Sequence, residues 1–236
     1  MKIALFGYGK MGHEIEAIAR EQGDTIAEVF DEFRPVELKP LSGVDVCIDF
    51  STPDAAVGNI RLAIEAKRDI VVGTTGWSEH LPEFRSAMKD SGLLYSSNFS
   101  LGMNYFFRIV RRAAELMNNA NEYDVFVHET HHRQKLDSPS GTALSLARIV
   151  IDQIERKKEI LTRPPDGKIK PEMLHVSSTR VGTVAGDHIV GFDSEADSIE
   201  LRHVAKTRRG FALGALAAAR WLHGRKGIYT MDDVEL

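Results

Sequence analysis

Cysteine is scarce in this sequence, since Cys47 is the only one among 236 residues. An internal disulfide is therefore excluded, and the apolar run Val44–Phe50 around this residue predicts a buried thiol. No apolar run approaches the ~20 residues that a membrane-spanning helix needs. The opening Met1–Phe6 is too short for the apolar core of a signal peptide. We therefore expect a cytoplasmic protein that has no membrane partner.

An excess of charge of either sign is also missing. The 30 basic and 34 acidic residues leave a formal net charge of −4, so the overall charge does not point to nucleic acid as a partner. Lys and Arg are nevertheless dense near 131–135 and 202–209, which favours a small anionic ligand. With 43% hydrophobic residues, the chain can bury a sizeable core in one large or two small domains.

In the first hundred residues, short apolar runs alternate with stretches of helical spacing. Strands are predicted at 2–6, 25–30, 44–50, 70–72 and 93–95, and helices at 11–22, 55–66 and 79–89. Strands that alternate with helices predict an α/β fold with a Rossmann-like, doubly wound parallel sheet. In such sheets, ligands bind beyond the carboxyl ends of the strands.

The pattern changes after about residue 100. Helices are predicted at 103–117 and 140–154, and strands at 123–128, 175–181, 188–192 and 198–204. The last three strands have no helix between them, which predicts a second, α+β domain with a mostly antiparallel or mixed sheet. We expect a dinucleotide-binding domain over 1–98, completed by a C-terminal helix at about 211–236. Residues 99–210 would form a substrate-binding and oligomerisation domain.

A glycine-rich turn follows the first predicted strand. It reads Gly7-Tyr8-Gly9-Lys10-Met11-Gly12 and opens the first predicted helix. In a dinucleotide-binding turn, the first glycine permits the tight turn and the second lets a pyrophosphate approach the backbone. The third allows the helix to pack closely on the strand. Glycine turns are common after strands, but this one has the expected position.

An acidic residue ends the second predicted strand. Asp31 lies 19 residues beyond Gly12, where a carboxylate can accept hydrogen bonds from the ribose hydroxyls of a nucleotide. Asp31 and Glu32 would repel a 2′-phosphate, which favours NADH. Arg34 lies close by in the sequence, so NADPH remains an alternative cofactor.

The most informative stretch runs from His131 to Thr142 and reads HHRQKLDSPSGT. Imidazoles exchange protons near neutral pH, and a Lys adds fixed positive charge. Ser138 is the expected N-cap of the helix that follows, with Pro139 at its first position. The free N–H groups of a helix start can bind an anion. This stretch predicts a place where a small polyanion is held and protonated, and with the glycine turn it indicates hydride transfer coupled to protonation.

Residues 128–132 read His-Glu-Thr-His-His, which matches the zinc pattern H-E-x-x-H. That pattern binds metal only on a helix, where both imidazoles share one face. The alternation over 123–127 predicts a strand, on which His128 and His132 would lie about 13 Å apart. We therefore predict no metal site.

Taken together, these stretches resemble the dihydrodipicolinate reductase family (4-hydroxy-tetrahydrodipicolinate reductases). The resemblance covers nearly the whole chain, and the HHRxKxDxPSGTA segment is its most specific part. It is carried by Gly7–Gly12, Asp49–Pro53, Val71–Gly76, Ser97–Ser100, Glu129–Ala143, Arg180–Gly182 and Gly186–Val190.

The resemblance implies a nicotinamide-dependent reduction of a cyclic, unsaturated dicarboxylate in lysine and diaminopimelate biosynthesis, by a homotetramer built through the sheet of the second domain. His131 and Lys135 would supply the proton and stabilise charge. His132, Gly141 and Thr142 would bind the substrate carboxylates. The residues implied to line the nicotinamide are Gly73, Thr74, Thr75, Ser96, Ser97, Asn98 and Phe99.

Two positions depart from the family pattern. Glu32 and Thr52 stand where members often carry Arg, and both changes remove positive charge near the ribose. The departures therefore favour NADH over NADPH as the cofactor.

Two other functions remain as alternatives. A related two-domain amino-acid dehydrogenase, acting on diaminopimelate or aspartate, would share the nucleotide domain. It has no reason to carry the His131-His132-x-x-Lys135 signature. An NAD(H)-sensing regulator would need a DNA-binding module, and the sequence predicts no helix-turn-helix segment.

Overall fold

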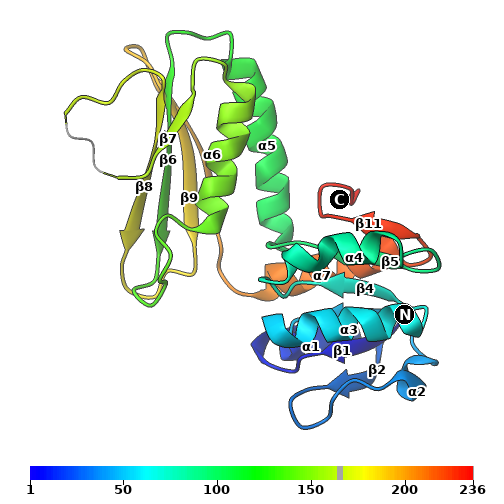
Figure 1. Ribbon diagram of the computed structural model, residues 1–236. Coiled ribbons are helices and arrows are strands. Elements are labelled where there is room, and N and C mark those ends of the chain that lie inside the picture. Colours follow the sequence, from blue (N-terminus) through cyan, green and yellow to red (C-terminus); the bar gives the residue numbers. More distant parts are fainter. Residues whose placement is uncertain (164–166, 236) are drawn as a thin grey trace. The chain divides into compact units, whose positions relative to one another are not determined.

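The computed structural model describes residues 1–163 and 167–235 (Figure 1). The chain divides into two compact units, each with its own sheet. Unit 1 comprises Met1–Asn104 together with Arg208–Leu236, and unit 2 comprises Tyr105–Thr207. Within the described ranges, no helix combines the length and the apolarity that crossing a bilayer requires.

Unit 1 is built on a six-stranded sheet in the order β11-β5-β4-β3-β1-β2. Every neighbouring pair in this sheet is parallel. Its strands are β1 (Lys2–Phe6), β2 (Thr25–Phe30), β3 (Val46–Asp49), β4 (Asp69–Val72), β5 (Gly92–Tyr95) and β11 (Gly227–Tyr229). The predicted Rossmann-like sheet is thus confirmed.

Helices cover both faces of this sheet because its strands are apolar on both sides. Ile3 and Leu5 of β1 pack in one core with α1 (Lys10–Glu21) and α7 (Arg209–Leu222). Ala4 and Phe6 point the other way, into a second core. That core contains residues of α2 (Leu38–Leu41), α3 (Pro53–Glu65) and α4 (Leu81–Arg85). Two cores on opposite faces are what a doubly wound sheet requires.

Two predicted helices are shorter than expected. Residues 79–89 form only a 3₁₀ turn, η1 (Ser78–His80), and the five-residue α4. The last helix, α7, ends at Leu222, close to Gly224 with φ +79°, so it covers only the first part of the C-terminal segment over about 211–236 that we expected to complete this domain. Beyond that glycine, β11 joins the edge of the sheet beside β5.

Unit 2 contains a mixed sheet in the order β10-β9-β6-β8-β7. The neighbours β6 and β8 are parallel, as are β7 and β8, whereas β9 runs antiparallel to both β6 and β10. This confirms the predicted mixed sheet. Its strands are β6 (Asp124–His131), β7 (Glu159–Leu161), β8 (Met173–Arg180), β9 (Asp187–Asp193) and β10 (Ser198–Val204).

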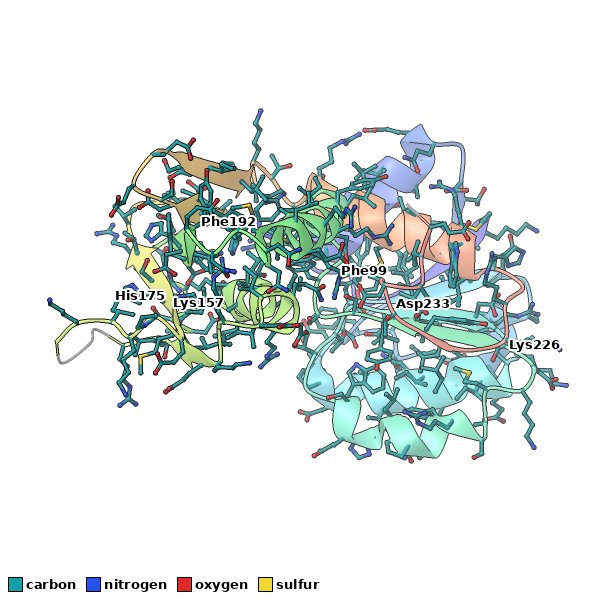
Figure 2. The ribbon with its side chains drawn as sticks, turned by 90° about the horizontal axis from the view of Figure 1, so that it is seen from above. Phe99, Lys157, His175, Phe192, Lys226 and Asp233 are labelled. Atoms are coloured by element: carbon teal, nitrogen blue, oxygen red, sulfur yellow. The ribbon has the colours of Figure 1, made fainter. Side chains whose placement is uncertain are left out.

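Both large helices of unit 2 lie on one face of its sheet. The helices α5 (Leu101–Met117) and α6 (Gly141–Gln153) run side by side there, as Figures 1 and 2 show from two directions. Val125, Val127, Glu129 and His131 alternate along β6 and are buried. Among the described residues, no helix covers the opposite face, which we call the open sheet face.

Candidate active site

The glycine turn between β1 and α1 has the geometry that its sequence predicts. Gly7 has φ +91°, and a Cβ there would lie 2.4 Å from the carbonyl oxygen of Phe50. A Cβ on Gly12 would lie 2.5 Å from the carbonyl oxygen of Gly7. Both positions therefore require glycine. A Cβ on Gly9 would meet nothing within 4 Å, so this part of the backbone faces open space that an anionic group can enter.

Two adjoining cavities lie at the carboxyl ends of β1 to β4, and they share Gly9, Phe50 and Ser51. One, of about 610 Å³, is lined by residues that include Gly7, Tyr8, Gly9, Asp31, Glu32 and Phe33. The other, of about 430 Å³, is lined by residues that include Gly9, Lys10, Met11, Gly73, Thr74 and Thr75. An elongated molecule with a central anionic group fits this arrangement.

Asp31 is held by the turn that follows β2. Its Oδ1 accepts hydrogen bonds from the backbone N–H groups of Phe33 and Arg34, at 2.9 and 3.0 Å. Among the described residues, no donor hydrogen-bonds to its Oδ2. The guanidinium of Arg34 pairs with Glu28 at 2.6 Å and lies 4.9 Å from the centre of the Phe30 ring. Arg34, the cation nearest to Asp31 in the sequence, therefore already forms an ion pair with a carboxylate.

Sequence reasoning missed two residues in this region. Phe33 lines the larger cavity with its side chain 86% exposed, which no pattern in the sequence signals. Asp49 is fully buried and accepts hydrogen bonds from Ser51, Asn59 and Thr74. The signal available in the sequence was the position of this acidic residue within an apolar run. The hydroxyl of Thr74 thus points to Asp49, which fixes the loop after β4.

The residues after β5 line neither cavity. Ser96 accepts a hydrogen bond from the backbone N–H of Asn98 at 3.1 Å, and Ser97 is exposed. Phe99 is only 1% exposed and packs edge-on against Phe50, with ring centroids 5.8 Å apart. In this structure, the side chain of Phe99 belongs to the core of unit 1.

Strand β6 extends to His131, three residues beyond the predicted end. Successive side chains on a strand alternate between its two faces. His128 therefore lies on the open sheet face, where its Nδ1 is 2.8 Å from the hydroxyl of Ser177. Glu129 and His131 lie on the buried face. This excludes the helical arrangement that an H-E-x-x-H zinc site needs.

Glu129 is the centre of a buried network in unit 2. Its Oε1 accepts hydrogen bonds from the backbone N–H of Ser140 at 2.8 Å, from the hydroxyl of Ser178 at 2.9 Å and from Arg180 at 2.7 Å. Its Oε2 lies 2.7 Å from Nδ1 of His131 and 3.8 Å from Nε2 of His188. Burial favours the neutral acid, but the hydrogen bonds outweigh it and lower the pKa of Glu129 to about 2.

The two imidazoles of this network have lowered pKa values. Burial lowers the pKa of His131, and Lys135 and Arg180 lower it further, while Glu129 acts in the opposite direction. Burial, followed by the neighbouring His131, lowers the pKa of His188 to about 4. The two rings contact edge to face, with centroids 5.1 Å apart. The neutral form is therefore favoured for both rings.

Glu129, His131 and His188 offer one donor atom each within 4.8 Å of one another. However, Nδ1 of His131 and Oε2 of Glu129 are 2.7 Å apart. Two ligands of one tetrahedral zinc ion lie about 3.3 Å apart, given bonds of about 2.0–2.1 Å. Arg180 also occupies the other oxygen of the same carboxylate. The spacing and the cation favour a proton-binding cluster over a metal centre.

The helix that begins near this cluster starts later than predicted. Ser140, not Ser138, is the N-cap of α6, because its hydroxyl accepts a hydrogen bond from the backbone N–H of Ala143 at 3.1 Å. Gly141 and Thr142 are the first two helical residues. Their backbone N–H groups are therefore at the positive end of the helix dipole, as the proposed anion site requires.

A carboxylate of the chain already lies at this helix start. Lys135 contacts Asp137 at 2.8 Å. The hydrogen bond from Lys135, together with one from the backbone of Gly141, lowers the pKa of Asp137. Nδ1 of His132 is buried and has no hydrogen-bond partner among the described residues. A carboxylate held by a lysine therefore lies close to the start of α6.

Known proteins match this chain over nearly its whole length, and the matches agree on one family. The family model of the dihydrodipicolinate reductase N-terminus matches residues 1–99, and that of the C-terminus matches residues 102–234. A 4-hydroxy-tetrahydrodipicolinate reductase of Christiangramia forsetii is 40% identical over 99% of this chain and 97% of its own length. One of Aquifex aeolicus is 38% identical over 93% of this chain and 82% of its own.

A solved structure has the same fold. It is the dipicolinate-bound dihydrodipicolinate reductase of Paenisporosarcina sp. TG-14, with a TM-score of 0.80 and 22% identity over 98% of this chain and 97% of that chain. The two family models leave only the junction between residues 99 and 102 and the last residues unmatched. This chain belongs to the dihydrodipicolinate reductase family.

Proposed function

We propose that this chain catalyses the NAD(P)H-dependent reduction of 4-hydroxy-tetrahydrodipicolinate, with His131 and Lys135 as its catalytic residues. The observation that carries the proposal is the carboxylate held at the start of α6. There, Lys135 contacts the carboxylate of Asp137 at 2.8 Å, and the backbone N–H of Gly141 helps to lower the pKa of this carboxyl. A substrate carboxylate is the same chemical group, so it can use the same contacts.

Unit 2 would bind the substrate. A ring dicarboxylate carries two negative charges, and the stretch around His131 offers Lys135, His132 and the N–H groups of Gly141 and Thr142. His131 lies on the adjoining strand end and can exchange a proton at neutral pH. The cationic surroundings that lower its pKa would be offset by a bound dianion, which favours the protonated ring. His131 would thereby become the acid when substrate binds.

Unit 1 would bind the cofactor, which supplies the hydride when bound. Its pyrophosphate would lie at Gly9 and the start of α1, and Asp31 would accept the ribose hydroxyls. The nicotinamide half would occupy the cavity lined by Gly73, Thr74 and Thr75. The residues Ser96 to Phe99, which line neither cavity in this structure, remain predicted contacts of the nicotinamide.

NADH is the favoured cofactor in this proposal. Asp31 and Glu32 both line the larger cavity, where a 2′-phosphate would lie. Arg34, the nearest cation in sequence, is paired with Glu28. Two carboxylates beside an occupied guanidinium disfavour an additional phosphate.

The proposed assembly is a homotetramer formed through the open sheet face. This face is partly apolar, since it includes Phe126, Ile189 and the 48% exposed Val204. No helix of the described residues covers it, and an uncovered apolar sheet face is a common site of self-association.

The activity can be tested on the purified protein with the condensation product of aspartate semialdehyde and pyruvate. We expect NADH to be consumed faster than NADPH at equal concentration. His131→Gln should lower turnover by on the order of a hundredfold or more, because the proton donor is lost. His80→Gln, on an exposed turn of unit 1, is the matched control and should keep full turnover. Oxidation of diaminopimelate instead would favour the dehydrogenase alternative.

A further inference from the structure

We propose that Glu129 is a positioning residue for His131: it holds the ring through Nδ1 and leaves Nε2 as the nitrogen that exchanges the proton. The use of that proton rests on the proposed function, whereas the arrangement of the ring does not. Each part of the proposal follows from the contacts of one buried carboxylate.

The first part is that hydrogen bonds fix the orientation of the Glu129 carboxylate. Its Oε1 is bound by donors from two separate elements. They are the backbone N–H of Ser140 at the start of α6, and the side chains of Ser178 and Arg180 on β8. The side chain is fully buried, so no water competes for these bonds. Oε2 is therefore fixed toward the imidazoles of His131 and His188.

The second part concerns which nitrogen of His131 carries the permanent proton. Glu129 is ionised, so it can only accept hydrogen bonds. A stable contact with Nδ1 at 2.7 Å then requires a proton on Nδ1. The two groups are close but do not meet the angular requirement of a hydrogen bond, so a small rotation of the ring would align them.

The third part concerns the space beside the other ring nitrogen, Nε2. Nε2 of His131 faces Gly186, and a Cβ at that position would lie 3.1 Å from it. Glycine therefore leaves space beside Nε2 that any other residue would occupy. With Nδ1 assigned to Glu129, Nε2 is the nitrogen that gains and loses a proton.

The charged groups around His131 make Glu129 the main support of the protonated ring. Arg180 from β8, Lys135 from the following loop and His188 from β9 surround the ring, and the first two oppose its protonation. Glu129 and Asp137 are the anions that favour it. Glu129 has the larger influence of these two anions and contacts the ring itself. Without it, the charged form of His131 would have little support.

Glu129→Gln tests the proposal because it removes the charge and keeps the shape. Turnover should fall by on the order of 10- to 1000-fold. The pKa of His131 should fall, since the largest favourable influence on its charged form is gone. The limb of the pH–rate profile on which activity is lost as His131 deprotonates should then move to lower pH. A variant with lower turnover and an unmoved profile would show that Glu129 only supports the fold.

Asp124→Asn is the matched control. Asp124 lies at the other end of β6 and pairs with the buried Lys157, so the same chemical change is made on the same strand. Its pH–rate profile should equal that of the unchanged protein. A shift of equal size in this variant would overturn the specific role of Glu129.

A second measurement needs neither a variant nor turnover. ¹⁵N NMR of the imidazole of His131 in the unchanged protein distinguishes the two neutral tautomers. We expect the proton on Nδ1 at a pH above the pKa of this ring. A proton on Nε2 would overturn the proposal even if the protein is an active reductase. Absence of reductase activity with the expected tautomer would instead overturn only the proposed function.

Discussion

His188 illustrates how much one buried residue contributes at the residue scale. It is 4% exposed, and its ring lies beside His131, with Nε2 3.4 Å from the hydroxyl of Ser140. Burial lowers its pKa from 6.5 to about 4. The unfolded chain therefore binds a proton at a higher pH than the folded chain does. The contribution of His188 to the stability of the fold is fully present above pH 6.5 and is lost as the pH falls toward 4.

We expect the free energy of unfolding to fall by about 3 kcal/mol through this residue between pH 6.5 and 4. His188→Gln should remove that part of the pH dependence, because glutamine does not titrate. Urea unfolding at a series of pH values measures it. His80→Gln, at a half-exposed position, should keep the full dependence. Identical slopes for both variants and the unchanged protein would contradict the assignment.

The sequence singled out the proposed catalytic residues of unit 2 but not the buried carboxylate that contacts one of them. His131 and Lys135 stand out because cations and imidazoles are dense in one short stretch. Glu129 does not stand out, because its partners Ser178 and Arg180 lie about fifty residues away in the chain and meet it only when β8 pairs with β6. Long-range pairing of this kind leaves no local pattern.

At the scale of elements, the apolar strands of the unit 1 sheet were predictable, the four-residue β4 and β5 included, whereas three other short elements were not. The strand Thr25–Phe30 was predicted to the residue, because its boundaries are marked by a glycine and an aspartate. The elements α2, β7 and β11 contain only three or four residues each, which is too few to show a period. Their position depends on the edges of the sheets and on the neighbouring helix, not on their own residues.

The turn after β2 gives an element-scale prediction. Asp31 accepts two backbone hydrogen bonds there, and the ring of Phe33 stays 86% exposed on the wall of the larger cavity. An exposed aromatic ring beside the proposed ribose site is suited to stack on a purine. Phe33→Ala should therefore weaken NADH binding about fivefold or more, since base stacking contributes ~1–3 kcal/mol.

Fluorescence titration measures this binding, and a truncated cofactor provides the internal control. Reduced nicotinamide mononucleotide lacks the adenosine, so its affinity should be the same for Phe33→Ala and the unchanged protein. Leu116→Ala removes another exposed apolar side chain, on α5, and should leave NADH binding unchanged. Equal loss of affinity for both cofactors would show that Phe33 shapes the loop and does not contact adenine.

At the scale of the whole molecule, the chain leaves unit 1 along α5 and returns to it at α7. Unit 2 is therefore an insertion between β5 and the last helix, and both ends of the chain belong to unit 1. Its sheet buries one face under its own helices and leaves the other uncovered among the described residues. A sheet with one uncovered, partly apolar face gains stability by pairing with another copy.

The proposed homotetramer can be tested by placing a charge on that face. Ile189 lies on β9, opposite His128 of β6, near the middle of the open sheet face. Ile189→Lys should convert the tetramer to smaller species, because a buried lysine without a partner is costly. Light scattering coupled to size exclusion measures the mass. Leu38→Lys, a similar change on unit 1, should leave the tetramer intact. NADH binding should survive in both variants, since the cavities are in unit 1, and a tetrameric Ile189→Lys protein would place the interface elsewhere.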